Sequence, residues 1–133
     1  MIVIDASWIV ALRDAGDDHH PQAVATSREM ANEEAALHPV TLAECLVAPA
    51  RLGVLEEASA GLRAAFDVTD VDQDAPMRWA QLRAATGLRL PDAIVLDTAL
   101  HQGARALATF DDSLAARAAD HGLEVLGAAA ASQ

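Results

Sequence analysis

Residues 105–127 read RALATFDDSLAARAADHGLEVLG, and this stretch decides the fold class. Its first six residues form an apolar run typical of a buried strand. The segment 111–122 has the spacing of an amphipathic helix ending at Gly122, and 123–127 predicts a second strand. Two strands joined by a crossover helix lie parallel in one sheet. The stretch therefore predicts an α/β protein with a parallel sheet.

Beyond this unit, the same alternation of short apolar runs and amphipathic segments extends back to the N-terminus. It predicts strands at 2–4, 35–38 and 67–71, and helices at 7–13, 21–33, 41–51, 54–65, 74–86 and 91–101. Strands separated by helices imply a three-layer sandwich, in which a mainly parallel central sheet carries helices on both faces. With no repeat or linker, the chain is expected to form one domain over 1–127, with 128–133 as a frayed tail.

The charge balance is acidic, at −11, with 20 Asp and Glu against nine basic residues, all of them arginine. Coating a nucleic acid by electrostatics alone needs clustered positive charge, so the composition argues against that class of protein. It leaves open an enzyme that reaches phosphates through metal ions. Two Trp, two Phe and no Tyr also leave few rings on which bases could stack.

The sequence carries no signal for export or membrane insertion. No apolar run approaches the roughly 20 residues of a spanning helix, and no basic region precedes the N-terminal apolar stretch, as it would in a signal peptide. The lone Cys45 cannot form an internal disulfide, which fits a reducing compartment, and its apolar surroundings favour a core position. We therefore expect a cytoplasmic protein without membrane contact.

Four carboxylates stand next to apolar sequence at points where the chain is expected to leave the predicted sheet. Asp5 and Asp111 follow strands directly, while Glu44 and Asp92 are expected in the first turns of helices. In an open parallel sheet the ligand crevice lies beyond the carboxyl ends of the strands, so the four side chains are expected to meet there. Taken singly, each acid has an ordinary role as a cap, a turn residue or a solvated helix residue. Together they predict a metal site.

Carboxylates that share a crevice repel one another, by roughly 4 kcal/mol for a pair 4 Å apart at an effective dielectric of 20, so the cluster requires cations. Oxygen ligands of this kind suit Mg²⁺ or Mn²⁺. A metal held there can acidify a bound water and neutralise charge on a phosphodiester, which is nuclease chemistry. Asp5 would be the central ligand, and Asp92 and Asp111 would complete or bridge the metal sites. Glu44 would orient or deprotonate the attacking water.

The motifs around these acids carry a family resemblance. In chain order they are IDAS with Asp5, TLAEC with Glu44, LPDAIVL with Asp92 and ATFD with Asp111. The series resembles the PIN domain of VapC-type toxins, over nearly the whole chain. The resemblance implies a PIN-like fold and a Mg²⁺- or Mn²⁺-dependent endoribonuclease that cleaves RNA. It also implies the toxin component of a toxin–antitoxin pair, with a VapB-type antitoxin as partner and a homodimer as the assembly. The alternative is a catalytically idle PIN-like module for protein interaction or regulation.

Several assignments around the site stay open from the sequence. Either Asp111 or Asp112 could face the metal, although the Thr109-x-Asp111 spacing favours Asp111. Ser7 is equally compatible with capping the first helix and with an accessory role at the site, and Thr109 is a possible accessory residue as well. The candidate contacts to substrate phosphates are Arg13, Arg51, Arg83 and Arg89.

Three further features have interpretations outside the crevice. Asp97 lies about 140° round its helix from Asp92, so we expect it to pair with His101 at i+4 instead of binding metal. The adjacent acids and histidines at 17–20 fit a solvated loop better than a metal site. An excess of apolar residues on the helices at 41–65 predicts a groove for the antitoxin, with Leu46, Val47, Leu52 and Leu55 as its members.

Overall fold

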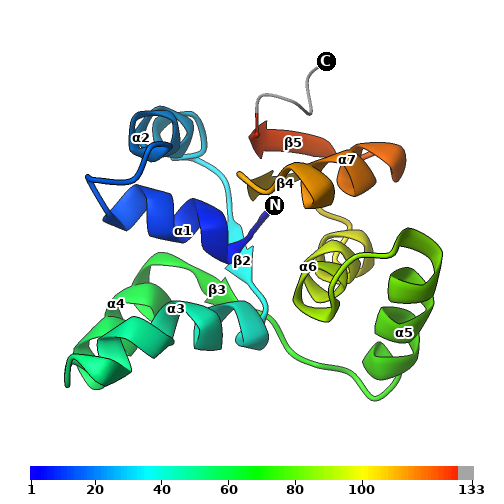
Figure 1. Ribbon diagram of the computed structural model, residues 1–133, viewed down its shortest axis with the longest axis horizontal. Helices are drawn as coiled ribbons and strands as arrows, with labels where there is room; N and C mark the ends of the chain where they lie inside the picture. Colours follow the sequence, from blue (N-terminus) through cyan, green and yellow to red (C-terminus); the bar gives the residue numbers. More distant parts are fainter. Residues whose placement is uncertain (129–133) are drawn as a thin grey trace.

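The computed structural model describes residues 1–128, which form seven helices around a five-stranded sheet (Figure 1). The strands are β1 (Ile2–Ile4), β2 (Ala35–Leu37), β3 (Asp67–Val68), β4 (Ala106–Thr109) and β5 (Glu124–Gly127). The helices are α1 (Ala6–Arg13), α2 (His20–Glu29), α3 (Pro39–Arg51), α4 (Leu55–Ala65), α5 (Ala75–Thr86), α6 (Leu90–His101) and α7 (Asp112–Asp120). Within this described part, no helix is long and apolar enough to cross a membrane.

The alternation of strands and helices is confirmed, with differences at the element ends. The strand expected at 67–71 contains only Asp67 and Val68, and the helix expected at 21–33 ends at Glu29. The helix predicted at 41–51 begins earlier, at Pro39, because proline suits the first helical turn and the His38 side chain caps it by accepting a hydrogen bond from Val40 N.

The sheet is parallel throughout, in the order β3-β2-β1-β4-β5. The first strand is central, with Val3 in register with Ala36 on one side and Leu107 on the other. Because β1 and β4 are parallel neighbours, the residues that follow them emerge at the same edge of the sheet. This topology brings Asp5 and Asp111 to one edge.

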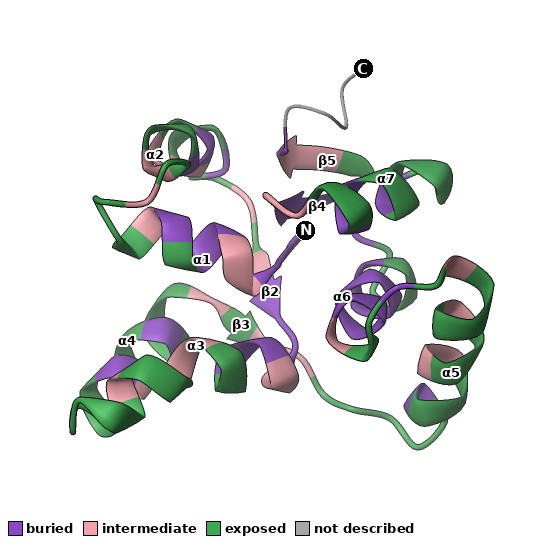
Figure 2. Cartoon of the chain, viewed as in Figure 1, coloured by how far each residue is buried: buried purple, intermediate pink, exposed green. Residues whose placement is uncertain are grey.

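Alternation along the strands divides the core between the two faces of the sheet. Ile2 and Ile4 point to one face and pack with Trp8 of α1 in a cluster that includes residues of α2, α3 and α4. Val3 points to the other face and packs with residues of α6 and α7, such as Leu96 and Leu114. Figures 1 and 2 show these helices on either side of the strands. The α/β three-layer sandwich with a parallel central sheet is confirmed.

Helix α6 is the most buried helix, since α5 covers the side that would otherwise face solvent (Figure 2). This packing overturns the expected pairing of Asp97 with His101. Asp97 instead accepts hydrogen bonds from Arg78 Nε at 2.9 Å and Trp79 Nε1 at 3.0 Å, both on α5. His101 Nε2 lies 3.7 Å from Asp72 Oδ1. The predicted Asp97–His101 pair was wrong because the buried Asp97 carboxylate accepts hydrogen bonds from donors on the neighbouring helix. Spacing along a single helix does not reveal such partners.

Two other expectations concern single segments. Cys45 is half-buried against the first core cluster, and burial raises the pKa of its thiol to about 11, as suits a packing residue. The frayed tail expected at 128–133 falls mostly on residues 129–133, which lie outside the described residues. Ala128, the first residue of that segment, is buried and donates its N–H to Thr109 O at 2.8 Å.

Candidate active site

Asp5 lies at the centre of the site because β1 delivers it to the carboxyl edge of the sheet. Its backbone N–H donates to Ala108 O of β4 at 2.9 Å, and its side chain is almost fully buried. The carboxylate oxygen Oδ2 accepts hydrogen bonds from Ser7 Oγ at 2.8 Å and Thr109 Oγ1 at 2.7 Å. Both hydroxyls act on the same oxygen, so Oδ1 is left without a hydrogen bond from residues 1–128.

The two hydroxyls also bind the backbone of the β4–α7 connection. Ser7 Oγ accepts from Phe110 N at 3.0 Å, and Thr109 Oγ1 accepts from Asp111 N at 3.0 Å. Ser7 therefore contacts the site, while the α1 N-cap residue is Asp5, which makes no side-chain cap bond. Together the hydroxyls fix the start of α1 and the end of β4 around one carboxylate.

Asp92 enters the crevice from the first turn of α6, where the positive end of the helix dipole favours a carboxylate. It is buried, and burial raises the pKa of its carboxyl group. The negative charges of Asp111 and Asp5 raise this pKa further, while Arg89 opposes the rise. The Arg89 guanidinium makes only long contacts with Asp92 Oδ2, 3.4 Å from Nε and 3.5 Å from Nη2. The negative charge of Asp92 is thus only partly compensated.

Glu44 stands on the exposed rim of the crevice, one turn further along its helix than expected. The sequence placed it in a first turn, but α3 begins at Pro39, so Glu44 lies in the second turn. Partial desolvation raises the pKa of its carboxyl group, and the charges of Asp5 and Asp92 raise it further. The charges of Asp5 and Asp92 therefore act on Glu44, as those of Asp5 and Asp111 act on Asp92.

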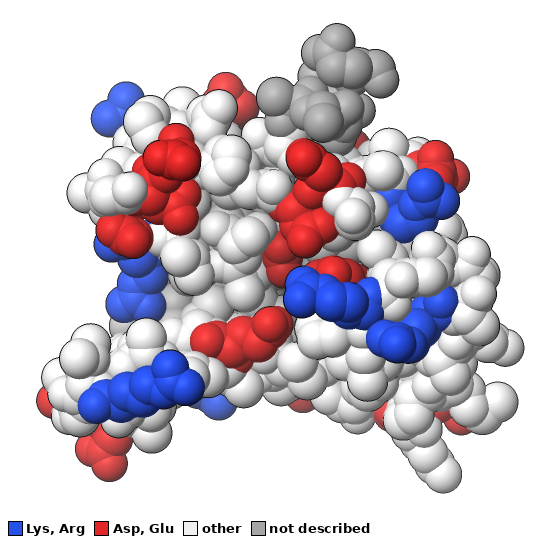
Figure 3. Space-filling view, viewed as in Figure 1, with Lys and Arg blue, Asp and Glu red and all other residues white. Residues whose placement is uncertain are grey.

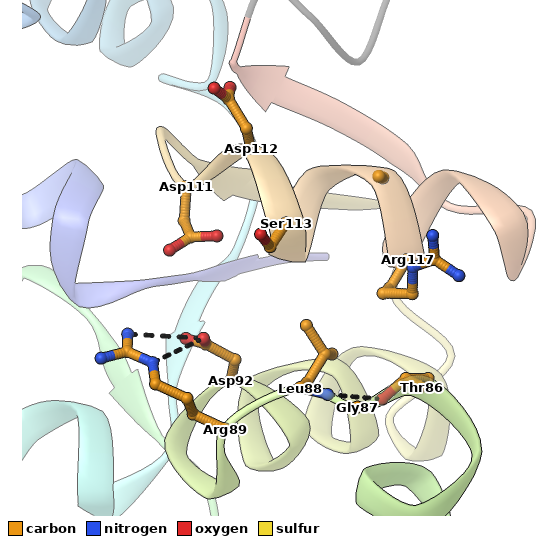
Figure 4. Close-up of a pocket in the computed structure, with 10 residues that line it drawn as sticks. Thr86, Gly87, Leu88, Arg89, Asp92, Asp111, Asp112, Ser113 and Arg117 are labelled. Atoms are coloured by element: carbon orange, nitrogen blue, oxygen red, sulfur yellow. Dashed lines mark hydrogen bonds and ion pairs between the residues drawn. The ribbon is translucent and has the colours of Figure 1, made fainter.

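The choice between Asp111 and Asp112 is decided by where the chain enters α7. Asp111 is the N-cap residue, and its Oδ1 accepts a hydrogen bond from Leu114 N at 2.9 Å. Figure 4 shows the Asp111 carboxylate pointing toward Asp92, whereas Asp112 points away from it. Both residues line the cavity, and Asp111 is the one whose carboxylate points toward Asp92.

Comparison with known protein families gives a match that covers most of the chain. The family model for the PIN domain matches residues 2–120. The chain belongs to the PIN domain family. No curated protein shows significant sequence similarity to this PIN domain.

Solved structures share the fold of this PIN domain at low sequence identity. A toxin–antitoxin complex from Klebsiella pneumoniae has 25% identity and a TM-score of 0.68, covering 84% of this chain and 87% of its own. VapC20 from Mycobacterium tuberculosis, a Sarcin-Ricin loop cleaving toxin, has 22% identity and a TM-score of 0.70, covering 88% of this chain and 95% of its own. FitAcB from Neisseria gonorrhoeae has 20% identity and a TM-score of 0.71, covering 95% of this chain and 96% of its own.

The donor set of the PIN-domain crevice fits a hard divalent cation. All four donors are carboxylates, and acidic side chains gather in the middle of one face of the molecule, over α3, α6 and α7 (Figure 3). Among residues 1–128, no three His, Cys, Asp or Glu side chains already stand close enough to ligate one ion. Like charges that repel are expected to stand apart, and a bound cation would draw them together. Burial raises the pKa of Asp92, the charges of Asp111 and Asp5 raise it further, and a bound cation would offset these charges.

Two features beside the crevice were not found by sequence reasoning. Arg117 of α7 lines a cavity shared with Asp92 and Asp111, although nothing in the local pattern distinguishes it from other exposed helical arginines. The His19 ring stacks on Phe110 with centroids 4.5 Å apart, which ties the loop at 17–20 to the β4–α7 connection. Both depend on contacts between segments far apart in the sequence.

Proposed function

We propose that this PIN-domain protein is a Mg²⁺- or Mn²⁺-dependent endoribonuclease and the toxin of a VapBC-type toxin–antitoxin pair. The observation that carries the proposal is the cavity lined by Asp92 and Asp111, where burial and the charges of neighbouring acids raise the pKa values of Asp92 and of the nearby Glu44, with Asp5 acting on both. The structural similarity to a toxin–antitoxin complex and to a Sarcin-Ricin loop cleaving toxin supports it. No feature of the crevice favours the catalytically idle alternative.

In the proposed reaction, each acid has a distinct task. Asp5, Asp92 and Asp111 would hold the cation, which when bound acidifies water and neutralises charge on the phosphodiester. Ser7 and Thr109 keep the Asp5 carboxylate oriented through Oδ2. Glu44 would accept the proton of the attacking water, and its raised pKa makes it a stronger base than an ordinary glutamate.

The antitoxin is proposed to cover an apolar surface beside the crevice. A cavity of about 440 Å³ lies between α1 and α3, with Ile9, Val10 and Leu52 in its lining. Leu52 is 77% exposed, and Val47 and Leu55 are exposed as well, whereas Leu46 packs partly against the core. Of the four residues predicted for the groove, only Leu52 lines this cavity, while Leu46 and Leu55 line a second hollow between α3 and α4. Exposed apolar surface of this kind favours a protein partner. The homodimer remains a prediction from the family resemblance.

The test is RNA cleavage by the purified protein in Mn²⁺ and in EDTA, with the protein encoded by the adjacent upstream gene added as the inhibitor. We expect Asp5→Asn to lower cleavage more than about 100-fold, because changes to residues that merely orient a metal ligand already cost about 10- to 100-fold. Asp112→Asn is the matched control and should cleave normally. Normal cleavage by Asp5→Asn with loss of cleavage by Asp112→Asn would refute the site.

A further inference from the structure

A trough begins at the acidic crevice. It lies between α7 and the turn that joins α5 to α6. It has a volume of about 630 Å³. Asp92, Asp111 and Asp112 line one end, and Figure 4 shows Arg117 at the other, beyond Ser113. Small residues leave the trough open along its length, since its walls include Gly87 and Ala116, and a Cβ added at Gly87 would meet no atom within 4 Å.

The Arg117 guanidinium is available to an anion in this trough. Its side chain is 44% exposed and, within residues 1–128, makes one ion pair, with Asp120 one turn further along α7 at 3.1 Å. Exposed pairs of this kind contribute little, so a phosphate that accepts two guanidinium hydrogen bonds can compete with Asp120. By contrast, Arg78 and Arg105 are each held by two acids and are not available in this way.

Arg89 marks the near end of the same trough. Its side chain is 77% exposed, and its contacts with Asp92 are long, so the guanidinium can turn toward a ligand that enters beside the carboxylates. A chain with a net charge of −11 repels RNA as a whole, so binding must depend on positive groups placed next to the site. Arg89 and Arg117 are the arginines that line this trough.

We infer that the trough holds the RNA backbone to one side of the scissile phosphate, with Arg117 binding a neighbouring phosphate and Arg89 the phosphate nearest the carboxylates. The inference rests on the proposed function and adds a binding direction, from the crevice along α7. Arg117 is a substrate-binding residue in this scheme and takes no part in bond cleavage.

The experiment measures binding of a fluorescein-labelled single-stranded oligoribonucleotide by anisotropy in EDTA, which stops cleavage, over a series of salt concentrations. Each lost phosphate contact lowers the slope of log K against log salt by about 0.7 for a single strand. We therefore expect Arg117→Gln to bind more weakly with a slope reduced by about 0.7. Arg117→Lys keeps the charge and should keep the slope. Arg28→Gln, an exposed arginine on α2 that is absent from the trough lining, is the matched control and should behave as wild type.

A second measurement separates this inference from the proposed function. In Mn²⁺, Arg117→Gln should raise KM several-fold with little change in kcat. Equal slopes for wild type, Arg117→Gln and Arg28→Gln, or no RNA binding by any of them, would overturn the trough. Normal cleavage by wild type together with equal slopes would refute RNA binding in the trough and leave the proposed nuclease activity standing. A slope difference without any cleavage would keep the trough and refute the nuclease.

Discussion

Two hydroxyl groups orient the Asp5 carboxylate at the centre of the site. Thr109 is fully buried, and its Oγ1 donates to Asp5 Oδ2 while accepting from Asp111 N. Hydrogen bonds to a charged group contribute about 1.5–3 kcal/mol, so losing the Thr109 hydroxyl affects both a metal-binding candidate and the connection that carries the next one. Ser7 supplies the second hydroxyl but is less buried.

At this scale we predict that Thr109→Val lowers kcat for RNA cleavage by about 10- to 100-fold, the usual effect of removing a residue that orients a metal ligand. Valine keeps the shape of threonine, so the fold should persist with a loss of roughly 1–3 kcal/mol in unfolding free energy. Thr109→Ser retains the hydroxyl and should retain most of the activity. Full activity in Thr109→Val would show that Asp5 needs no such support.

At the scale of the element, α3 depends on a histidine at its start. His38 is buried, its Nδ1 accepts a hydrogen bond from Val40 N, and its ring makes an edge contact with Trp79. Burial lowers the pKa of His38, and the negative charge of Asp97 opposes this only in part. The cap needs a neutral ring, because a protonated Nδ1 cannot accept.

A histidine whose pKa is lower in the folded state binds fewer protons there than in the unfolded chain, so folding stability falls as the pH drops below the unfolded value of about 6.5. We predict that His38→Asn, which keeps a capping side chain, reduces this loss of melting temperature between about pH 7.5 and pH 5. His121→Asn, at an exposed position, should keep the wild-type pH dependence. Identical pH profiles for all three proteins would exclude His38 as the titrating group.

At the scale of the whole molecule, folding collects like charges that the unfolded chain keeps apart. Asp5 and Asp111 are more than 100 residues apart in the sequence, yet both raise the pKa of Asp92. A divalent cation that binds this arrangement binds only the native state, so it stabilises the fold by linkage.

We predict that Mn²⁺ raises the melting temperature and that EDTA reverses the effect, with about 2.7 kcal/mol of stabilisation when free metal is 100 times its dissociation constant. Asp5→Asn should lose most of the shift. Glu29→Gln removes an exposed acid on α2 and should keep it. Equal shifts in all three proteins would place the cation elsewhere on the acidic surface.

Much of the fold was predictable because it depends on local periodicity. Apolar strands alternating with amphipathic helices require a parallel sheet with two covered faces. The order of the strands along the chain then indicates that Asp5 and Asp111 share an edge, since parallel strands end together. Glu44 and Asp92 followed from motifs at helices that leave the same edge, so the candidate acids were accessible from the sequence.

The tertiary structure alone decided which groups meet. Asp111 and Asp112 are neighbours in sequence, and the entry of the chain into α7 determines which of them faces Asp92. The partners of Asp97 come from α5, and Arg117 joins the trough because α7 packs beside the α5–α6 turn. Periodicity along one segment specifies which face is buried, whereas the choice of partner across that face depends on the packing of segments that are distant in the chain.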